Sequence, residues 1–197
     1  QLPGLNIGRT GFTEDEAKSM GYDAISVVTV VDDKAHYFPG SSAFIIKMTA
    51  DKNTKKLLGL QVLGLDRSAV DKIVDIAVTA ISLDGSLEDI KDLDLAYAPP
   101  FSTAIHPFAH TVNVLLNKIS GDFVTATPRE FSNGDFNDYK LIDASITPKL
   151  SNATYVDLPK VNGEIKGFDK DDKMLICCDK GKRAYLLQNR LKHYGYE

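Results

Sequence analysis

The stretch LDLAYAPPFSTAIHPFAHTVNVLLNKISG, residues 93–121, divides the chain into two differently patterned halves. Pro99 and Pro100 exclude a helix through its first part, because proline lacks an N–H group and restricts the residue before it. A helix can resume from Ser102 or Thr103, with Pro107 in its first turn. The apolar face of that helix is expected to comprise Val112, Leu115, Leu116 and Ile119. The stretch therefore predicts a stiff extended segment followed by a packed helix.

Two histidines in this stretch, His106 and His110, lie four residues apart. That spacing could place both rings on one helix face, where they could bind a metal ion. No Cys, Asp or Glu lies beside them at helical spacing to supply a third ligand. We therefore predict no metal site, and we expect the histidines to cap the helix or to line an interface.

Residues before this stretch alternate β-branched runs with polar turns. The runs at 25–31, 43–48 and 57–63 predict three strands, joined antiparallel by short connections. Apolar residues at helical spacing predict a helix over 68–83, with Asp66 or Ser68 as its cap. Short helices with capping boxes are predicted after Thr13 and Ser86. The first half is thus expected to be an α+β unit, a three-stranded antiparallel sheet covered by helices.

Composition narrows the classes of function. The chain has 197 residues, 43% of them hydrophobic and 25% charged, as in ordinary globular proteins. The net charge is −4 and neither half has an excess of basic residues, so no nucleic-acid partner is expected. No apolar run reaches membrane-spanning length and no signal peptide is present, so we expect a cytoplasmic protein without a membrane partner. The chain begins QLPGLNIGR rather than with Met, which suggests an excised part of a longer protein.

The second half is patterned as an α/β unit. Thr127, Pro128 and Glu130 have the spacing of a capped helix start, after which Phe131 and Phe136 are expected to face inward. Strands are predicted at 139–143, 155–158 and 174–177, and a helix at 184–194. A strand followed by a loop and a helix is typical of a parallel sheet.

Both cysteines lie where the last predicted strand ends. Cys177 falls within the strand and is expected to be buried and inert. Cys178 leaves the strand just before a helix start, where backbone N–H groups and the positive helix end favour a thiolate or a bound anion. Gly181 permits the tight backbone path that such a loop needs. We therefore predict that Cys178 is the reactive thiol; the alternative is that both are packed strand cysteines.

The first half resembles a known family through several motifs. These are HYFPG at 36–40, LLGL at 57–60, SLEDI at 86–90 and DLAYAPPFS at 94–102. Over residues 9–120 the chain resembles the C-terminal dimerisation domain of FAD-dependent pyridine nucleotide-disulfide oxidoreductases, in the coenzyme A-disulfide reductase, NADH oxidase and polysulfide reductase branch. The resemblance implies a homodimer in which Tyr97 and Tyr37 reach the sulfur substrate at the partner's flavin site. Phe38 departs from the second tyrosine that is common there.

The second half resembles a rhodanese, or sulfurtransferase, domain. The resemblance rests on LID at 141–143 and on C-x-x-G-x-R from Cys178 to Arg183. It implies that Cys178 carries a sulfane sulfur as a persulfide, within a cradle formed by Asp179, Lys180, Gly181, Lys182 and Arg183. Ser145 stands where the family often has Arg, and the domain is short. A tyrosine-phosphatase loop needs five residues between Cys and Arg, whereas four are present here.

These patterns predict a dimerisation domain at 1–120, a linker at 121–127 and a truncated rhodanese-like domain at 128–197. By resemblance, the chain is the C-terminal part of a reductase of coenzyme A disulfides, persulfides or polysulfides. The FAD and NAD(P)H of that parent enzyme would belong to its flavin and nicotinamide domains. No cofactor is expected in this fragment, which lacks a G-x-G-x-x-G loop after a strand. The alternatives are a stand-alone sulfurtransferase acting on thiosulfate and a non-catalytic dimerisation or docking module with a degenerate rhodanese domain.

Overall fold

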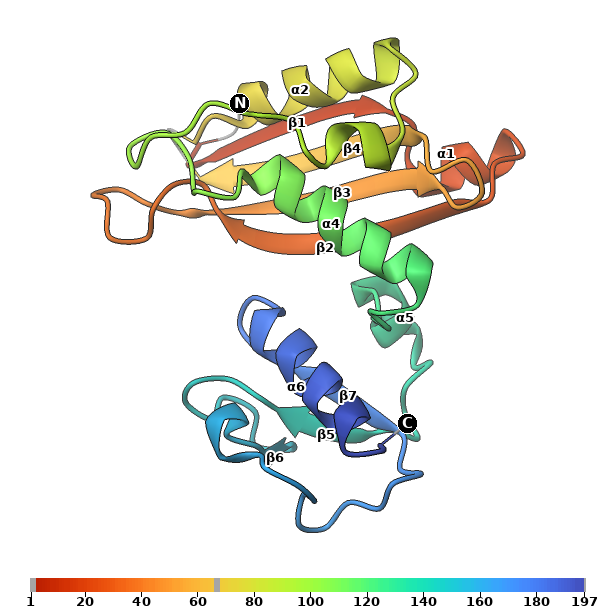
Figure 1. The fold of residues 1–197 in the computed structure, drawn as a ribbon, viewed down its shortest axis with the longest axis vertical. Coiled ribbons are helices and arrows are strands. Elements are labelled where there is room, and N and C mark those ends of the chain that lie inside the picture. Colours follow the sequence, from red (N-terminus) through yellow and green to blue (C-terminus); the bar gives the residue numbers. More distant parts are fainter. Residues whose placement is uncertain (1–2, 66–67, 197) are drawn as a thin grey trace. The chain divides into compact units, whose positions relative to one another are not determined.

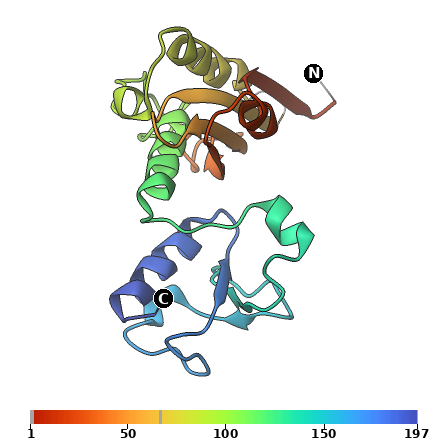
Figure 2. The same cartoon turned by 90° about the vertical axis from the view of Figure 1, so that its right-hand side faces the viewer.

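A computed structural model describes residues 3–65 and 68–196 of the chain (Figures 1 and 2). The chain forms two compact units, Gln1–Thr125 and Ala126–Glu197. The first contains an antiparallel sheet with helices and the second a parallel sheet with helices. The predicted fold classes of the two halves are therefore confirmed.

The sheet of the first unit has four strands rather than the predicted three. They are β1 (Leu5–Gly11), β2 (Ala24–Asp32), β3 (Ala43–Asp51) and β4 (Leu57–Leu65), in the order β1-β4-β3-β2. All neighbouring pairs are antiparallel. The additional strand, β1, pairs with β4 along its whole length, and it explains why the hairpin formed by β3 and β4 lies inside the sheet rather than at its edge.

Helices α2 (Val70–Ser82), α3 (Leu87–Ile90) and α4 (Pro107–Ser120) cover one face of this sheet. Helix α1 (Glu14–Ser19) packs apart from them, with Ala17 in a separate cluster beside Ala24 and Leu58. In Figure 1, α2 runs along β1 and β4, whereas α4 crosses β2 and β3. The core between sheet and helices contains Val62, Ile73, Phe108 and Leu115, each no more than 2% exposed. The predicted apolar face of α4 is confirmed, with Val112 and Leu115 buried, and Leu116 and Ile119 packed against the same core.

The helix starts were predicted with mixed success. The capping boxes at Thr13, Ser86 and Thr127 are confirmed. The predicted side-chain cap of α2 is wrong at Ser68, whose hydroxyl instead donates to the Leu65 carbonyl, and Asp66 lies outside the described residues. The predicted start of α4 at 102 or 103 is also wrong, because His106 caps the helix with Pro107 at its first position.

The second unit contains a three-stranded parallel sheet in the order β6-β5-β7. Its elements are α5 (Pro128–Asn133), β5 (Lys140–Asp143), β6 (Thr154–Tyr155), a 3-10 turn η1 (Leu158–Lys160), β7 (Met174–Cys177) and α6 (Lys182–His193). Helix α6 lies against the sheet (Figure 2). Its residues Leu187 and Leu191 are part of the buried core of this unit. Phe131 was wrongly expected to face inward, since it is 59% exposed; Phe136 is half-buried, with its ring edge-on to Tyr139.

Candidate functional site

The candidate site lies at the carboxyl edge of the parallel sheet in the second unit. Strands β5 and β7 are paired so that Asp143 is opposite Cys177, and the Ala144 N–H donates to the Cys177 carbonyl at 2.8 Å. Because parallel strands end at the same edge, the loops that follow β5 and β7 meet there. The topology thus brings both cysteines, Asp143 and the start of α6 to one place.

Cys178 lies between the end of β7 and the N-terminus of α6. Its side chain is half-buried, and its Sγ accepts a hydrogen bond from the Ala184 N–H at 3.4 Å. Gly181 is the N-cap residue and has φ of 79°, a left-handed conformation that glycine adopts without strain. The chain therefore turns tightly enough for a first-turn amide of α6 to reach the sulfur.

Cys177 faces a different environment from its neighbour. Its thiol donates to the Ile142 carbonyl at 3.2 Å, across the β5–β7 pair. Burial, and then the negative charges of Asp143 and the Cys178 sulfur, raise the pKa of the Cys177 thiol. Cys177 lies within the strand as predicted, but its side chain is half-buried rather than buried, and its inertness stays a prediction.

The charged residues of the Cys178 loop do not all face the sulfur. Arg183 donates through Nε to the Ala144 carbonyl at 2.5 Å, and its Nη2 lies 3.3 Å from the Asp157 carboxylate. Asp179 forms an ion pair with Lys149. Arg183 thus ties α6 to the loops that follow β5 and β6. Of the predicted cradle residues, Lys182, Lys180 and Gly181 are exposed at the helix start.

Asp143 is a site residue that the sequence analysis did not single out. Its side chain is buried and accepts hydrogen bonds from the N–H groups of Ser145, Lys149 and Leu150 at 2.7 to 3.0 Å. The Ser145 side chain and these backbone N–H groups hold the pKa of this carboxyl well below its usual range. Asp143 therefore organises the 145–150 loop beside Cys177. The sequence signal that could have identified Asp143 was its position as an acidic residue at the carboxyl end of a predicted strand.

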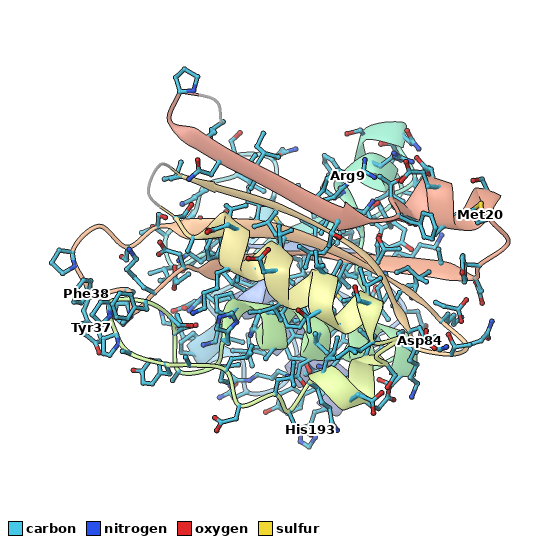
Figure 3. The ribbon with its side chains drawn as sticks, turned by 90° about the horizontal axis from the view of Figure 1, so that it is seen from above. Arg9, Met20, Tyr37, Phe38, Asp84 and His193 are labelled. Atoms are coloured by element: carbon cyan, nitrogen blue, oxygen red, sulfur yellow. The ribbon has the colours of Figure 1, made fainter. Side chains whose placement is uncertain are left out.

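The two tyrosines expected to contact substrate lie in the first unit. Tyr37 is 69% exposed on the loop between β2 and β3, and Tyr97 is 53% exposed on the segment before α4. Figure 3 shows Tyr37 and Phe38 at the tip of their loop, at the opposite end of the sheet from Met20. The loop and the 97–106 segment lie at the same end of this unit in Figures 1 and 3. The first unit thus presents exposed aromatic side chains from two loops at one end.

Neither a metal cluster nor a membrane helix is found in the part of the chain that the structure describes. Within residues 3–65 and 68–196, no group of three or more His, Cys, Asp or Glu side chains could hold a metal ion. His106 serves as a helix cap through Nδ1, which accepts the Phe108 N–H at 3.2 Å. None of the described helices combines the length and the apolar character needed to cross a membrane.

The first unit matches a known domain family. Residues 3–109 match the family described as pyridine nucleotide-disulphide oxidoreductase, dimerisation domain. The NAD(P)H sulfur oxidoreductase (CoA-dependent) of Pyrococcus furiosus is 36% identical over 111 residues, which cover 56% of this chain and 24% of that protein. This chain therefore spans about a quarter of the length of that relative.

Two solved structures match both units. The NAD-dependent persulfide reductase from A. fulgidus matches with a TM-score of 0.87 and 26% identity, over 100% of this chain and 36% of that one. The reduced CoADR-RHD of Bacillus anthracis matches with a TM-score of 0.83 and 27% identity, over 98% and 35% of the two chains. The match to the dimerisation domain covers more than half of the chain, and the chain accordingly belongs to the pyridine nucleotide-disulphide oxidoreductase family.

Proposed function

We propose that this chain is the C-terminal part of a flavin- and NAD(P)H-dependent reductase of coenzyme A disulfides, persulfides or polysulfides. In this proposal the first unit builds a homodimer, and Cys178 of the second unit carries sulfane sulfur. The hydrogen bond from Ala184 at the N-terminus of α6 to the Cys178 sulfur is the observation that carries the proposal. The likeness to relatives named for sulfur, coenzyme A and persulfide reduction supports the substrate class.

The proposed chemistry is sulfur transfer through a persulfide. The Cys178 sulfur attacks the outer sulfur of thiosulfate, forming a new S–S bond while the old one breaks and sulfite leaves. A nucleophile such as cyanide then attacks the outer sulfur, forming thiocyanate and returning the Cys178 thiolate. Backbone N–H groups at a helix start stabilise negative charge on sulfur in both steps. No other group in the chain needs to change its oxidation state.

The residues present do not fit FAD or a nicotinamide cofactor. The first unit has an antiparallel sheet, and the loop after β7 in the second unit has a single glycine, Gly181, rather than the glycine-rich turn that holds a pyrophosphate. We therefore assign both cofactors to the flavin and nicotinamide domains of the parent enzyme. In that enzyme, Tyr37 and Tyr97 are proposed to contact the sulfur substrate at the partner's flavin.

An uncovered apolar row supports partner binding by the first unit. On the sheet face opposite α2 and α4, the side chains of Ile7, Leu63, Ile45 and Val30 are cross-strand neighbours in all four strands. Ile7 is 59% exposed and Ile45 is 44% exposed. Apolar rows of this kind mark interaction surfaces. We propose that further domains of the parent chain or a second copy cover this face.

The test of the carrier role compares the two cysteines directly. Thiosulfate:cyanide sulfurtransferase activity should disappear in Cys178→Ser and persist in Cys177→Ser. Pulsed iodoacetamide labelling, read by mass spectrometry, should modify Cys178 faster than Cys177. Full activity in both variants would remove Cys178 as the carrier.

A second candidate function is a non-catalytic docking module with a degenerate rhodanese domain. Two contacts favour this docking function. Arg183 binds the Ala144 carbonyl and the Asp157 carboxylate, and Asp179 pairs with Lys149, so these charged side chains hold loops together. It predicts no thiosulfate turnover and no faster labelling of Cys178 than of Cys177, so the same two measurements distinguish the candidates. A purified chain that absorbs in the flavin band would contradict the assignment of FAD to other domains.

A further inference from the structure

The first unit, which contains neither cysteine, has a cleft of its own. Its volume is about 260 Å³, and its walls come from the loop after β2, the start of α2 and the 100–107 segment. Phe44 and Ile73 line it and are each 2% exposed, whereas Phe101 lines it and is 72% exposed. The cleft therefore has an apolar lining and an aromatic ring open to solvent.

Two lysines line the same cleft. Lys34 lies 3.6 Å from the carboxylate of Asp33, which also accepts the Ser42 N–H at 2.7 Å. No carboxylate among the described residues forms an ion pair with Lys72. Among the described residues that line the cleft, Lys34 and Lys72 thus face one carboxylate, that of Asp33, and this excess of positive charge favours an anionic ligand.

His106 also lines the cleft and supplies a hydrogen-bond donor. The ring is 6% exposed, and its Nδ1 accepts the Phe108 N–H, so the ring proton is on Nε2. Within the described residues, no acceptor for that proton is found. Burial, and then the charge of Lys72, lower the pKa of His106 to about 4, so the ring is a neutral donor at physiological pH. An acceptor atom of a ligand in the cleft would therefore take a hydrogen bond from this Nε2–H.

The start of α2 points to the same kind of ligand. Ala69, its N-cap residue, lines the cleft and supplies no side-chain cap to this 13-residue helix. The N-terminus of a helix carries a partial positive charge and N–H groups that bind anions. Lys72 lies in the first turn of the helix. The start of α2, the Lys72 ammonium group and the His106 Nε2–H therefore all favour a negatively charged group in this cleft.

From this geometry we infer that the cleft binds a small organic anion. A phosphate or carboxylate group is held by Lys72, the His106 Nε2–H and the start of α2, and a compact apolar body lies against Phe44 and Phe101. The inference concerns the first unit alone and does not depend on sulfur transfer or on the flavin domains.

Binding is tested on the whole chain by NMR titration with three probes of similar size. Phenyl phosphate and benzoate carry the two anionic groups, and benzyl alcohol is their neutral counterpart. We expect saturable shifts at His106, Lys72 and Phe101 with at least one of the anions, and a weaker response to benzyl alcohol. Equal binding of benzyl alcohol, or no saturable shift with either anion, would overturn the inference. The stronger of the two anions identifies the headgroup.

Two lysine variants separate a built site from general electrostatic attraction. Lys72→Met should weaken binding of the preferred anion by about tenfold or more, since hydrogen bonds to charged groups are the strong ones. Lys52→Met removes the same charge from an exposed loop of this unit and should leave the affinity within about twofold. Equal losses in both variants, or none in Lys72→Met, would contradict the proposed site.

His106 itself provides an independent readout. An anion between Lys72 and His106 stabilises the imidazolium, so saturating phenyl phosphate or benzoate should raise the pKa of His106 measured by NMR. The pKa of exposed His193 serves as the internal control and should not follow it. An unchanged His106 titration in the presence of a bound anion would place that anion elsewhere.

Discussion

At the residue scale, Asp143 shows how a single carboxylate can hold a loop at the carboxyl edge of a sheet. It ends β5, and its carboxylate accepts hydrogen bonds from the N–H groups of Ser145, Lys149 and Leu150. Without this carboxylate all three N–H groups would lose their acceptor, and the loss is costly at Ser145, which is buried. The position of the 145–150 loop beside the cysteines thus depends on one ionised side chain.

Replacing Asp143 by Asn should loosen that loop. The amide removes one acceptor oxygen and the negative charge, so we expect hydrogen exchange at Lys149 and Leu150 to rise by about tenfold or more. Asp138→Asn, which alters an exposed ion pair with Lys173, is the matched control. Because the folded-state pKa of Asp143 is lowered, its stabilising effect is present above about pH 3.9 and is lost as the pH falls below that value. Unchanged exchange in the variant would show that the loop has other support.

His106 predicts a second pH dependence, in the first unit. Its pKa is about 4 in the folded state and about 6.5 when unfolded, so the unfolded state binds the proton more readily between these values. Stability should therefore fall as the pH falls from about 6.5 towards about 4. Urea unfolding across this pH range measures it. His106→Asn keeps a good helix cap and should remove this component of the pH dependence; an identical profile in the variant would contradict it.

The environment of Cys178 is the part of the site that sequence reasoning predicted best. A strand, a glycine-containing loop and a helix start are local signals, and together they place a sulfur beside helix N–H groups. The positions of Arg183 and Asp143 were not predictable in the same way. Their partners, Ala144 and Asp157 for Arg183 and the 145–150 amides for Asp143, depend on how loops fold back, which local patterns do not specify.

At the element scale, β1 was missed by sequence reasoning. Its sequence LNIGRTG contains two glycines, which weaken any strand prediction. The structure explains Gly8 by close packing, since a Cβ there would lie 2.7 Å from Val74 Cγ2 on α2. By contrast, β2, β3 and β4 are rich in β-branched and aliphatic residues and were predicted. The start of α4 was misplaced because Pro107 serves as the first helical residue and His106 as its cap.

Gly59 offers a sharp test of the contact between β4 and the end of β1. A Cβ at this position would lie 1.9 Å from the Phe12 carbonyl oxygen, a backbone atom that cannot rotate away. Gly59→Ala should therefore lower the free energy of unfolding of the first unit by about 2 kcal/mol or more. Gly163→Ala, with no atom within 4 Å of the added carbon, should have little effect. Chemical denaturation followed by fluorescence or circular dichroism measures both, and equal stabilities would contradict so close an approach of Phe12 to Gly59.

At the scale of the whole molecule, the chain is two compact units joined near residue 125. The predicted linker at 121–127 lies at this junction and stays a prediction. Limited proteolysis should cut there before it cuts either unit, because exposed connecting segments are the preferred sites of cleavage. Mass spectrometry of the first products tests this. Early cleavage inside either sheet would contradict it.

The proposed homodimer is also a property of the whole molecule. Size-exclusion chromatography with light scattering should give a mass near twice that of one chain at micromolar concentrations. A dilution series provides the control, since a specific dimer dissociates with a defined constant rather than forming a range of larger species. A monomer at all accessible concentrations would show that the other domains of the parent enzyme are needed for dimerisation.

The opposite surroundings of Cys177 and Cys178 have a consequence for oxidation. One sulfur faces the Ile142 carbonyl within the sheet, and the other faces an amide of α6. A disulfide ring between neighbouring residues requires both sulfurs on the same side of the backbone, and an extended strand directs them apart. Closing that ring would release the end of β7, including the Ala144 to Cys177 hydrogen bond. The folded strand therefore opposes a disulfide between Cys177 and Cys178.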